Sequence, residues 1–193
     1  LKFSPLAMPR PPETMIFAAV SSGRSFLAIS APTKLELALS AAAATFSTAA
    51  LSILGPGHTF KTSVVSPKRG HIILVGGGDP YLATSARGDY PKRATISGLA
   101  RATASRLKHD GVKRVSLGYD ASLFKGPAWN PRWPSFYGDQ VSPTSALWVD
   151  EGHVGYGGVR YNNPAKEAAA AFAAALSKQG IKVTSTQSAH APT

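Results

Sequence analysis

The sequence predicts an α/β fold, because two kinds of segment alternate along the chain. Ala- and Leu-rich segments with helical spacing predict helices, and short runs of branched apolar residues predict strands. One combination occurs twice: residues 107–115 (LKHDGVKRV) and 176–184 (LSKQGIKVT) each end a helix, contain a glycine and continue into a strand. We therefore expect an α/β domain from about residue 56 onward.

The N-terminal quarter of the chain predicts an arm, a hairpin and a helix. Four prolines within residues 1–13 indicate an extended arm, which we assign to residues 1–15. Two short apolar runs, 15–20 and 25–29, flank a Gly-containing turn and predict a hairpin. Residues 34–54 are rich in Ala and Leu and lack Gly and Pro, which predicts a helix that ends at Gly55-Pro56-Gly57.

The next segments predict a second hairpin and then a helix–strand alternation. Residues 59–65 and 71–75 read as strands joined by a turn at 67–70. The later elements are a helix at 96–109, a strand at 112–119, a long loop at 126–144, a short strand at 146–149, a helix from Asn163-Pro164 to Lys178 and a strand at 181–184. The tail from residue 185 shows no pattern.

Composition excludes several chemistries and leaves the partner open. The chain has 193 residues, a net charge of +11 and no cysteine, which excludes disulfides, thiolate zinc sites and a Cys nucleophile. The five histidines are far apart, so we expect no metal and no cofactor. A strongly basic chain suits nucleic acid or an anionic surface such as a cell wall. Since the basic clusters lack interleaved aromatic residues, we expect no specific nucleic-acid binding.

We expect neither a membrane span nor a signal peptide in this chain. The longest apolar-leaning stretch, residues 38–54, is interrupted by Ser and Thr and is shorter than a membrane span requires. The N-terminus has no basic region followed by an apolar core.

A glycine run follows the strand at 71–75. Gly76, Gly77 and Gly78 could suggest a phosphate loop, but their spacing fits no nucleotide fingerprint. Asp79-Pro80 then places a negative charge where a phosphate would lie. We therefore interpret residues 76–80 as a structural turn.

Other candidate residues have competing interpretations. Asp150 and Glu151 are adjacent, so on a strand they would point to opposite faces and could share a site only across a turn. Asp110, Asp120 and Glu167 are typical of caps or solvated positions. The aromatic residues of the long loop could form a binding platform, although packing of that loop on its own domain is the simpler interpretation.

A serine–lysine pair is the remaining candidate for catalysis. A Ser three residues before a Lys at a helix N-terminus lies on the same face, so the amine can take the hydroxyl proton. Ser30 and Lys34 are four residues apart, and Ser40 is followed three residues later by Ala43. The spacing alone favours an ordinary capped helix.

Several segments together, in this order, resemble one known family. The segments are SSGRSFL (21–27), AALSILGPGHTFKTSVV (49–65), ILVGGGDPYL (73–82), YDASLFKGPAWNPRW (119–133), SALWVDEG (145–152) and NPAKEAAAAFAAALSKQGIKV (163–183). They resemble the class C penicillin-binding proteins, the serine-type D-alanyl-D-alanine carboxypeptidase/endopeptidase family. The resemblance covers roughly residues 16–185.

The resemblance implies a partial transpeptidase-like α/β domain followed by an inserted α/β domain. Residues 16–55 would be the N-terminal part of the transpeptidase-like domain, 56–185 the inserted domain and 186–193 a tail. It also implies an exported cell-wall enzyme that cleaves peptidoglycan stem peptides through an acyl-serine and is trapped by β-lactams. The alternative is a non-catalytic or truncated relative that binds anionic wall polymer or a partner protein.

The family's SxxK motif is incomplete in this sequence. A match on Lys34 as the base puts Ala31 at the nucleophile's position. A match on Ser40 as the nucleophile puts Ala43 at the base's position. The candidate catalytic residues are therefore Ser40, Lys34 and Ser30, none of which completes the motif.

Overall fold

The computed structural model describes residues 34–86, 93–155 and 158–192, with side chains of the first helix described from residue 44 onward. The chain divides into two compact units, residues 1–56 and 57–193. The arm expected at 1–15 and the hairpin expected at 15–29 lie outside the described residues. The domain assignments made from the resemblance remain predictions.

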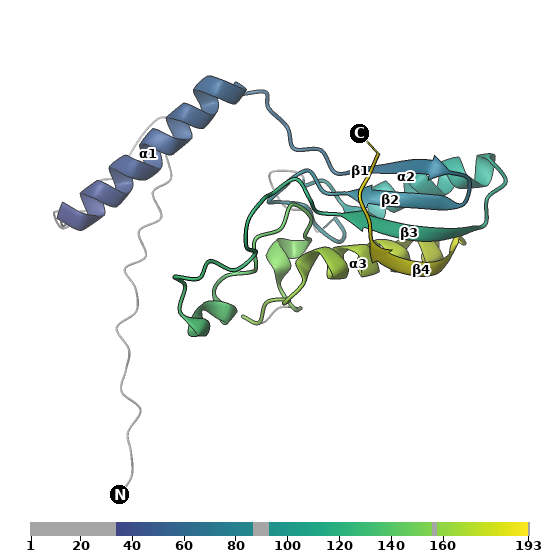
Figure 1. The fold of residues 1–193 in the computed structure, drawn as a ribbon. Coiled ribbons are helices and arrows are strands. Elements are labelled where there is room, and N and C mark those ends of the chain that lie inside the picture. Colours follow the sequence, from purple (N-terminus) through teal and green to yellow (C-terminus); the bar gives the residue numbers. More distant parts are fainter. Residues whose placement is uncertain (1–33, 87–92, 156–157, 193) are drawn as a thin grey trace, which may run out of the picture. The chain divides into compact units, whose positions relative to one another are not determined.

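The first unit contains helix α1, Lys34–Leu54, as the sequence predicts (Figure 1). Gly55 ends the helix with a left-handed φ of 78°, which a glycine adopts without steric cost. Its N–H donates to the carbonyl of Leu51 at 2.9 Å. The large side chains in the last turns of α1, Phe46, Leu51 and Ile53, are exposed.

The second unit is built on a four-stranded mixed sheet, which confirms the predicted α/β fold class (Figure 1). Its strands are β1 (Ser63–Lys68), β2 (His71–Val75), β3 (Arg114–Asp120) and β4 (Lys182–Ser188), arranged in the order β1-β2-β3-β4. β1 pairs with β2 antiparallel, as the predicted hairpin requires, and β2, β3 and β4 run parallel.

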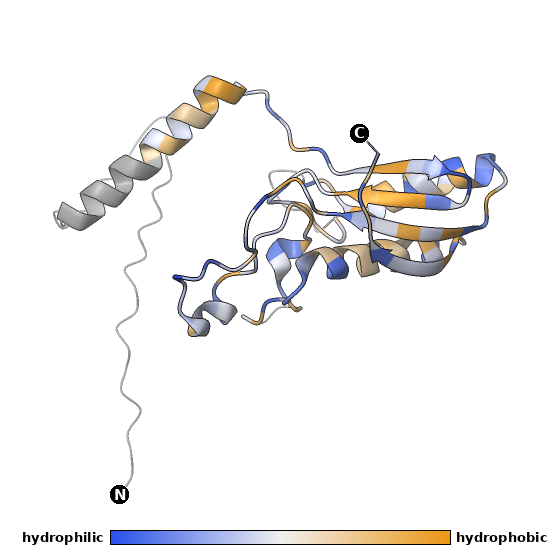
Figure 2. Cartoon of the chain, in the orientation of Figure 1, coloured by the Kyte–Doolittle hydropathy of each residue, from blue (hydrophilic) through white to orange (hydrophobic). Residues whose placement is uncertain are grey.

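Two helices cover one face of this sheet. Helix α2 (Ile96–His109) connects β2 to β3, and helix α3 (Pro164–Lys178) connects β3 to β4. The bounds of both helices agree with the prediction. Alternate strand residues and the helices share one apolar core, in which Ile72, Leu117 and Phe172 are almost fully buried. Because strand side chains alternate between faces, this pattern places both helices on the same side. Figure 2 shows the apolar residues along β1 and β2.

Caps and glycines set the ends of the two helices. The side chain of Thr95 accepts from the Gly98 N–H at the start of α2, and that of Asn163 accepts from the Lys166 N–H at the start of α3. Gly111 and Gly180, both with positive φ, follow the helix C-termini. The helix–Gly–strand echo in the sequence thus corresponds to two equivalent crossovers.

The C-terminal segment crosses the other face of the sheet. After β4, the Ala189 N–H donates to the carbonyl of Tyr119 at 2.9 Å. A β-carbon on Gly118 would lie 2.8 Å from the Ala189 methyl, so only glycine allows this approach. In Figure 1 the segment passes across the strands toward β1.

The structure corrects several predicted boundaries. β1 begins at Ser63 rather than at residue 59 and continues through Pro67, which was expected in the turn. An edge strand tolerates proline, and the register shifts between Val65 and Lys68. β3 covers residues 114–120 rather than 112–119.

Two further predictions were wrong. Residues 146–149 form no strand, because they meet the glycine run through a single backbone hydrogen bond rather than a ladder. The C-terminal residues expected to lack a pattern instead continue β4 to Ser188. The strand forms through backbone pairing with β3, which the polar sequence of this segment does not indicate.

Candidate functional site

Two of the candidate catalytic residues, Lys34 and Ser40, lie on α1. Lys34 and Ser40 are helix positions six residues apart. Six residues correspond to a rise of about 9 Å and a rotation of about 120° between the two positions. Three residues would bring them to nearly the same face. Ser30 lies outside the described residues.

The glycine run in the second unit is held against neighbouring backbone. The Gly76 N–H donates to the Asp120 carbonyl at 2.9 Å, and the Gly78 N–H donates to the Ala146 carbonyl at 2.8 Å. A β-carbon on Gly76 would overlap Ala146, and one on Gly77 would overlap the carbonyl of Lys61. Residues 76–78 therefore join three segments that are distant in sequence.

Asp79 extends the contact from the glycine run to the segment after residue 145. Its Oδ1 accepts from the Tyr81 N–H at 2.9 Å, which shapes the turn before Leu82. Its carbonyl accepts from the Trp148 indole N–H at 3.1 Å. The Asp150 N–H donates to the Leu82 carbonyl at 2.9 Å. Two stretches, 79–84 and 146–152, thus lie side by side.

Asp150 and Glu151 occupy a short 3₁₀ turn, Asp150–Gly152, in which both have positive φ (49° and 57°). Such values are uncommon outside glycine and concentrate at functional sites. The Asp150 carboxylate accepts from the backbone N–H and the hydroxyl of Thr84. Glu151 forms an ion pair with Arg93 at 3.6 Å. The two carboxylates are thus separated by a turn, as sharing a site would require, but the Asp150 carboxylate contacts Thr84 and the Glu151 carboxylate contacts Arg93.

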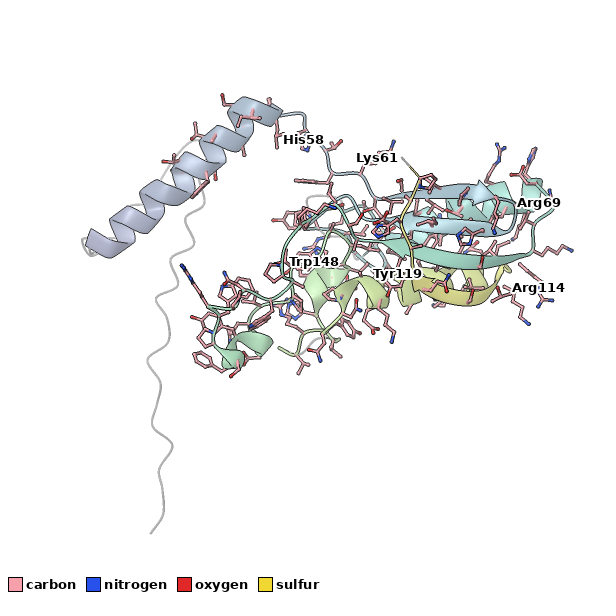
Figure 3. The ribbon with its side chains drawn as sticks, viewed as in Figure 1. His58, Lys61, Arg69, Arg114, Tyr119 and Trp148 are labelled. Atoms are coloured by element: carbon pink, nitrogen blue, oxygen red, sulfur yellow. The ribbon has the colours of Figure 1, made fainter. Side chains whose placement is uncertain are left out.

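A hollow of about 640 Å³ lies between this turn and the glycine run. Its walls combine aromatic, small or aliphatic, polar and charged residues: Gly78, Pro80, Tyr81, Phe124, Trp133, Gln140, Val141, Ser142, Thr144, Ser145, Trp148, Glu151 and Arg160. Figure 3 shows Trp148 among the side chains of this region. The guanidinium of Arg93 lies 5.4 Å from the centre of the Tyr81 ring, at the rim.

Arg160 holds one wall of the hollow. Its Nη1 donates to the Glu151 carbonyl at 2.8 Å and its Nη2 to the Gln140 carbonyl at 3.2 Å. Its Nε is buried and has no hydrogen-bond partner among the described residues. A guanidinium beside aromatic rings can hold a ligand that combines an apolar face with a carboxylate.

Asp120, expected to be a cap or a solvated residue, is instead buried at the end of β3. It accepts from the Ser122 N–H at 2.9 Å and the Ala191 N–H at 2.6 Å. Burial acts to raise its pKa, but these hydrogen bonds and the nearby His190 outweigh burial and place the pKa below its ordinary value. Asp120 thereby ties the C-terminal segment to the sheet.

Asp120 was expected to be a cap or solvated residue, and the sequence pointed to neither Arg160 nor the hollow. A signal existed for Asp120, because an Asp two residues before a Ser at a strand end is typical of an Asx turn. The sequence held no such signal for Arg160, because its partners are the backbone carbonyls of Gln140 and Glu151, and any residue carries a carbonyl.

The described residues contain no group of three or more His, Asp or Glu side chains that could hold a metal ion. Across the same ranges, no helix is long and apolar enough to cross a membrane.

Comparison with known proteins places the chain in a family. Residues 36–157 match the model of the D-Ala-D-Ala carboxypeptidase 3 (S13) family. The chain belongs to this family, which confirms the resemblance seen in the sequence. The matched range includes Ser40, the glycine run and the turn at Asp150, and excludes Lys34 and Arg160.

Two curated relatives are carboxypeptidases of mycobacteria. The chain is 31% identical over 124 residues to a carboxypeptidase of Mycobacterium tuberculosis, covering 60% of this chain and 26% of that protein. It is 31% identical over 123 residues to the carboxypeptidase DacB of Mycolicibacterium smegmatis, with the same coverage. The chain thus spans about a quarter of the length of these relatives.

Proposed function

We propose that this protein acts as a serine-type D-Ala-D-Ala carboxypeptidase or endopeptidase on peptidoglycan stem peptides. The observation that carries the proposal is the family match over residues 36–157. The names of the two mycobacterial relatives support it. A peptidoglycan substrate implies an exported protein at the cell wall.

The proposed chemistry is acyl transfer through a serine. The serine oxygen attacks the carbonyl carbon of the penultimate D-Ala while a base takes the hydroxyl proton. The C–N bond breaks, the departing amine takes the proton, and water then hydrolyses the ester. Ser40 and Ser30 are the candidate nucleophiles, and Lys34 is the candidate base. A β-lactam would acylate the same serine by ring opening.

Within the second unit, the hollow beside the turn at Asp150 is the candidate surface for binding a peptide. Tyr81, Trp133 and Trp148 offer apolar faces, and Arg160 offers a guanidinium. These groups match the methyl and carboxylate groups of a stem peptide.

Release of D-Ala from a peptide ending in D-Ala-D-Ala tests this function. We expect D-Ala release from that peptide and no release from a matched peptide ending in L-Ala-L-Ala. Loss of activity on substitution of Ser40 or Ser30 by Ala would identify the nucleophile. Equal rates on both peptides, or no release, would overturn the proposal.

A second candidate is a non-catalytic relative that binds anionic wall polymer or a partner protein. It is favoured by Ala31 and Ala43, which occupy the two positions that would complete a Ser–Lys pair. A net charge of +11 supports attraction to an anionic wall. Retention on purified peptidoglycan that falls as salt rises would support this candidate, because salt screens exposed charges.

A further inference from the structure

One end of the sheet gathers exposed cations from three separate turns. We call this surface the basic pole, and its members are Lys68, Arg69, Lys108, Lys113, Arg114, Lys178 and Lys182. It lies where β2, β3 and β4 begin and where α2 and α3 end. The glycine run and the hollow follow the other end of β2. Figure 3 shows Arg69 and Arg114 at the same end of the sheet.

Specific contacts join the three turns into one surface. The Ser116 N–H donates to the Gly70 carbonyl, and Nη2 of Arg69 lies 3.6 Å from the position of a β-carbon on Gly111. The Lys182 N–H donates to the Lys113 carbonyl at 2.9 Å. Within the sheet, Arg114 and Lys182 are direct register partners on β3 and β4.

Within the part of the chain that the structure describes, acidic side chains do not neutralise the pole. Its three segments, 66–71, 106–116 and 177–183, contain one acidic residue, Asp110. Asp110 is already engaged by Arg106 at 2.9 Å and by His109 at 3.1 Å. Among the described residues, none of the seven pole cations has an ion pair within 4 Å.

Helix capping accounts for only part of this charge. Lys108 and Lys178 lie in the last turns of their helices, where a cation favours the helix dipole. The other five members lie in strands or turns. Like charges opposite each other on a sheet, as at Arg114 and Lys182, cost stability rather than add to it. The clustered positive charges therefore do not stabilise the fold, and binding of an anionic partner explains them better.

We propose that the basic pole binds a flexible, phosphate-rich polymer of the cell envelope, with the phosphodiesters spanning the three turns. The three segments contain no Phe, Tyr or Trp, so the pole lacks the stacking surface on which single-stranded nucleic acids depend. It presents helix ends and turns rather than a helix face that could enter a DNA groove. The choice of an envelope polymer rests on the proposed function.

Binding of poly(glycerol phosphate) to the full chain tests the proposal. The test variant carries Arg69→Gln, Arg114→Gln and Lys182→Gln, and the control carries Lys125→Gln, Arg132→Gln and Lys166→Gln at exposed positions elsewhere. Both lose three positive charges. We expect the test variant to bind at least about tenfold more weakly and with a shallower salt dependence, since fewer counterions are released. We expect the affinity of the control variant to fall by no more than about threefold.

Three results would overturn the proposal: equal losses in both variants, unchanged binding in the test variant, or tighter binding of duplex DNA than of poly(glycerol phosphate). Arg69→Lys with Arg114→Lys keeps the charge and should keep the affinity, which separates charge loss from misfolding. Peptidase activity is measured independently of polymer binding. Absence of peptidase activity would not contradict polymer binding at the basic pole, and loss of polymer binding would not contradict the proposed peptidase activity.

Discussion

Gly77 lies so close to Lys61 that a β-carbon on the glycine would overlap the lysine's carbonyl oxygen. This approach fixes the segment before β1 against the loop after β2. The same loop bonds to Asp120 and Ala146 through Gly76 and Gly78. The glycine run thus closes the end of the sheet at which the hollow lies.

Gly77→Ala is expected to destabilise the protein by about 1–3 kcal/mol, because backbone must move to admit the methyl group. Gly138→Ala is the matched control, since a β-carbon there meets nothing within 4 Å and its φ is not positive. The control should stay within about 0.5 kcal/mol of the parent. Urea denaturation of both variants measures the difference. Equal stabilities would show that the approach at Lys61 carries no constraint.

Glu151 stores backbone strain beside the hollow. Glu151→Gly and Glu151→Gln both remove the ion pair with Arg93, but only glycine relieves the φ of 57°. We therefore expect the Gly variant to be more stable than the Gln variant by about 1 kcal/mol. Thermal melts compare the two variants directly. If the Gln variant were as stable as the Gly variant, the turn would hold no strain.

Asp120 is expected to make stability pH-dependent. Its folded-state pKa lies below the ordinary value of 3.8, because the hydrogen bonds from Ala191 and Ser122 outweigh burial. A depressed pKa contributes stability above the unfolded-state pKa, and this contribution is lost as pH falls through the folded-state value. Asp120→Asn should cost about 1–3 kcal/mol at neutral pH. The cost should shrink as the pH falls below about 4. A deficit that stays constant with pH would contradict this role.

Phe172 anchors α3 in the core and is fully buried. Phe172→Ala should cost about 3–5 kcal/mol through lost burial and the cavity left behind. Phe136, which is 72% exposed, serves as the control, and its replacement by Ala should change stability by less than about 1 kcal/mol. Denaturant midpoints measure both. Similar losses at the two positions would refute the assignment of the core.

The sequence predicted those elements whose stabilising interactions are local. The bounds of α1, α2 and α3 follow from composition, caps and terminal glycines, all of which act within a few residues. β4 depends on pairing with β3, so its polar residues gave no local signal. The hollow eluded prediction for the same reason, since it forms where residues 78–81 meet residues 140–160. The catalytic roles of Ser40, Lys34 and Ser30 stay predictions, and the structure places Lys34 and Ser40 six residues apart on α1.

Intact mass after incubation with benzylpenicillin shows directly whether a serine of this chain is acylated. Ring opening adds the whole β-lactam to the serine without a leaving group. We therefore expect one added benzylpenicillin mass per chain, located by peptide mapping on Ser40 or Ser30 and absent after substitution of that serine by Ala. A chain whose mass is unchanged, or that is modified at another residue, would contradict an acyl-serine mechanism.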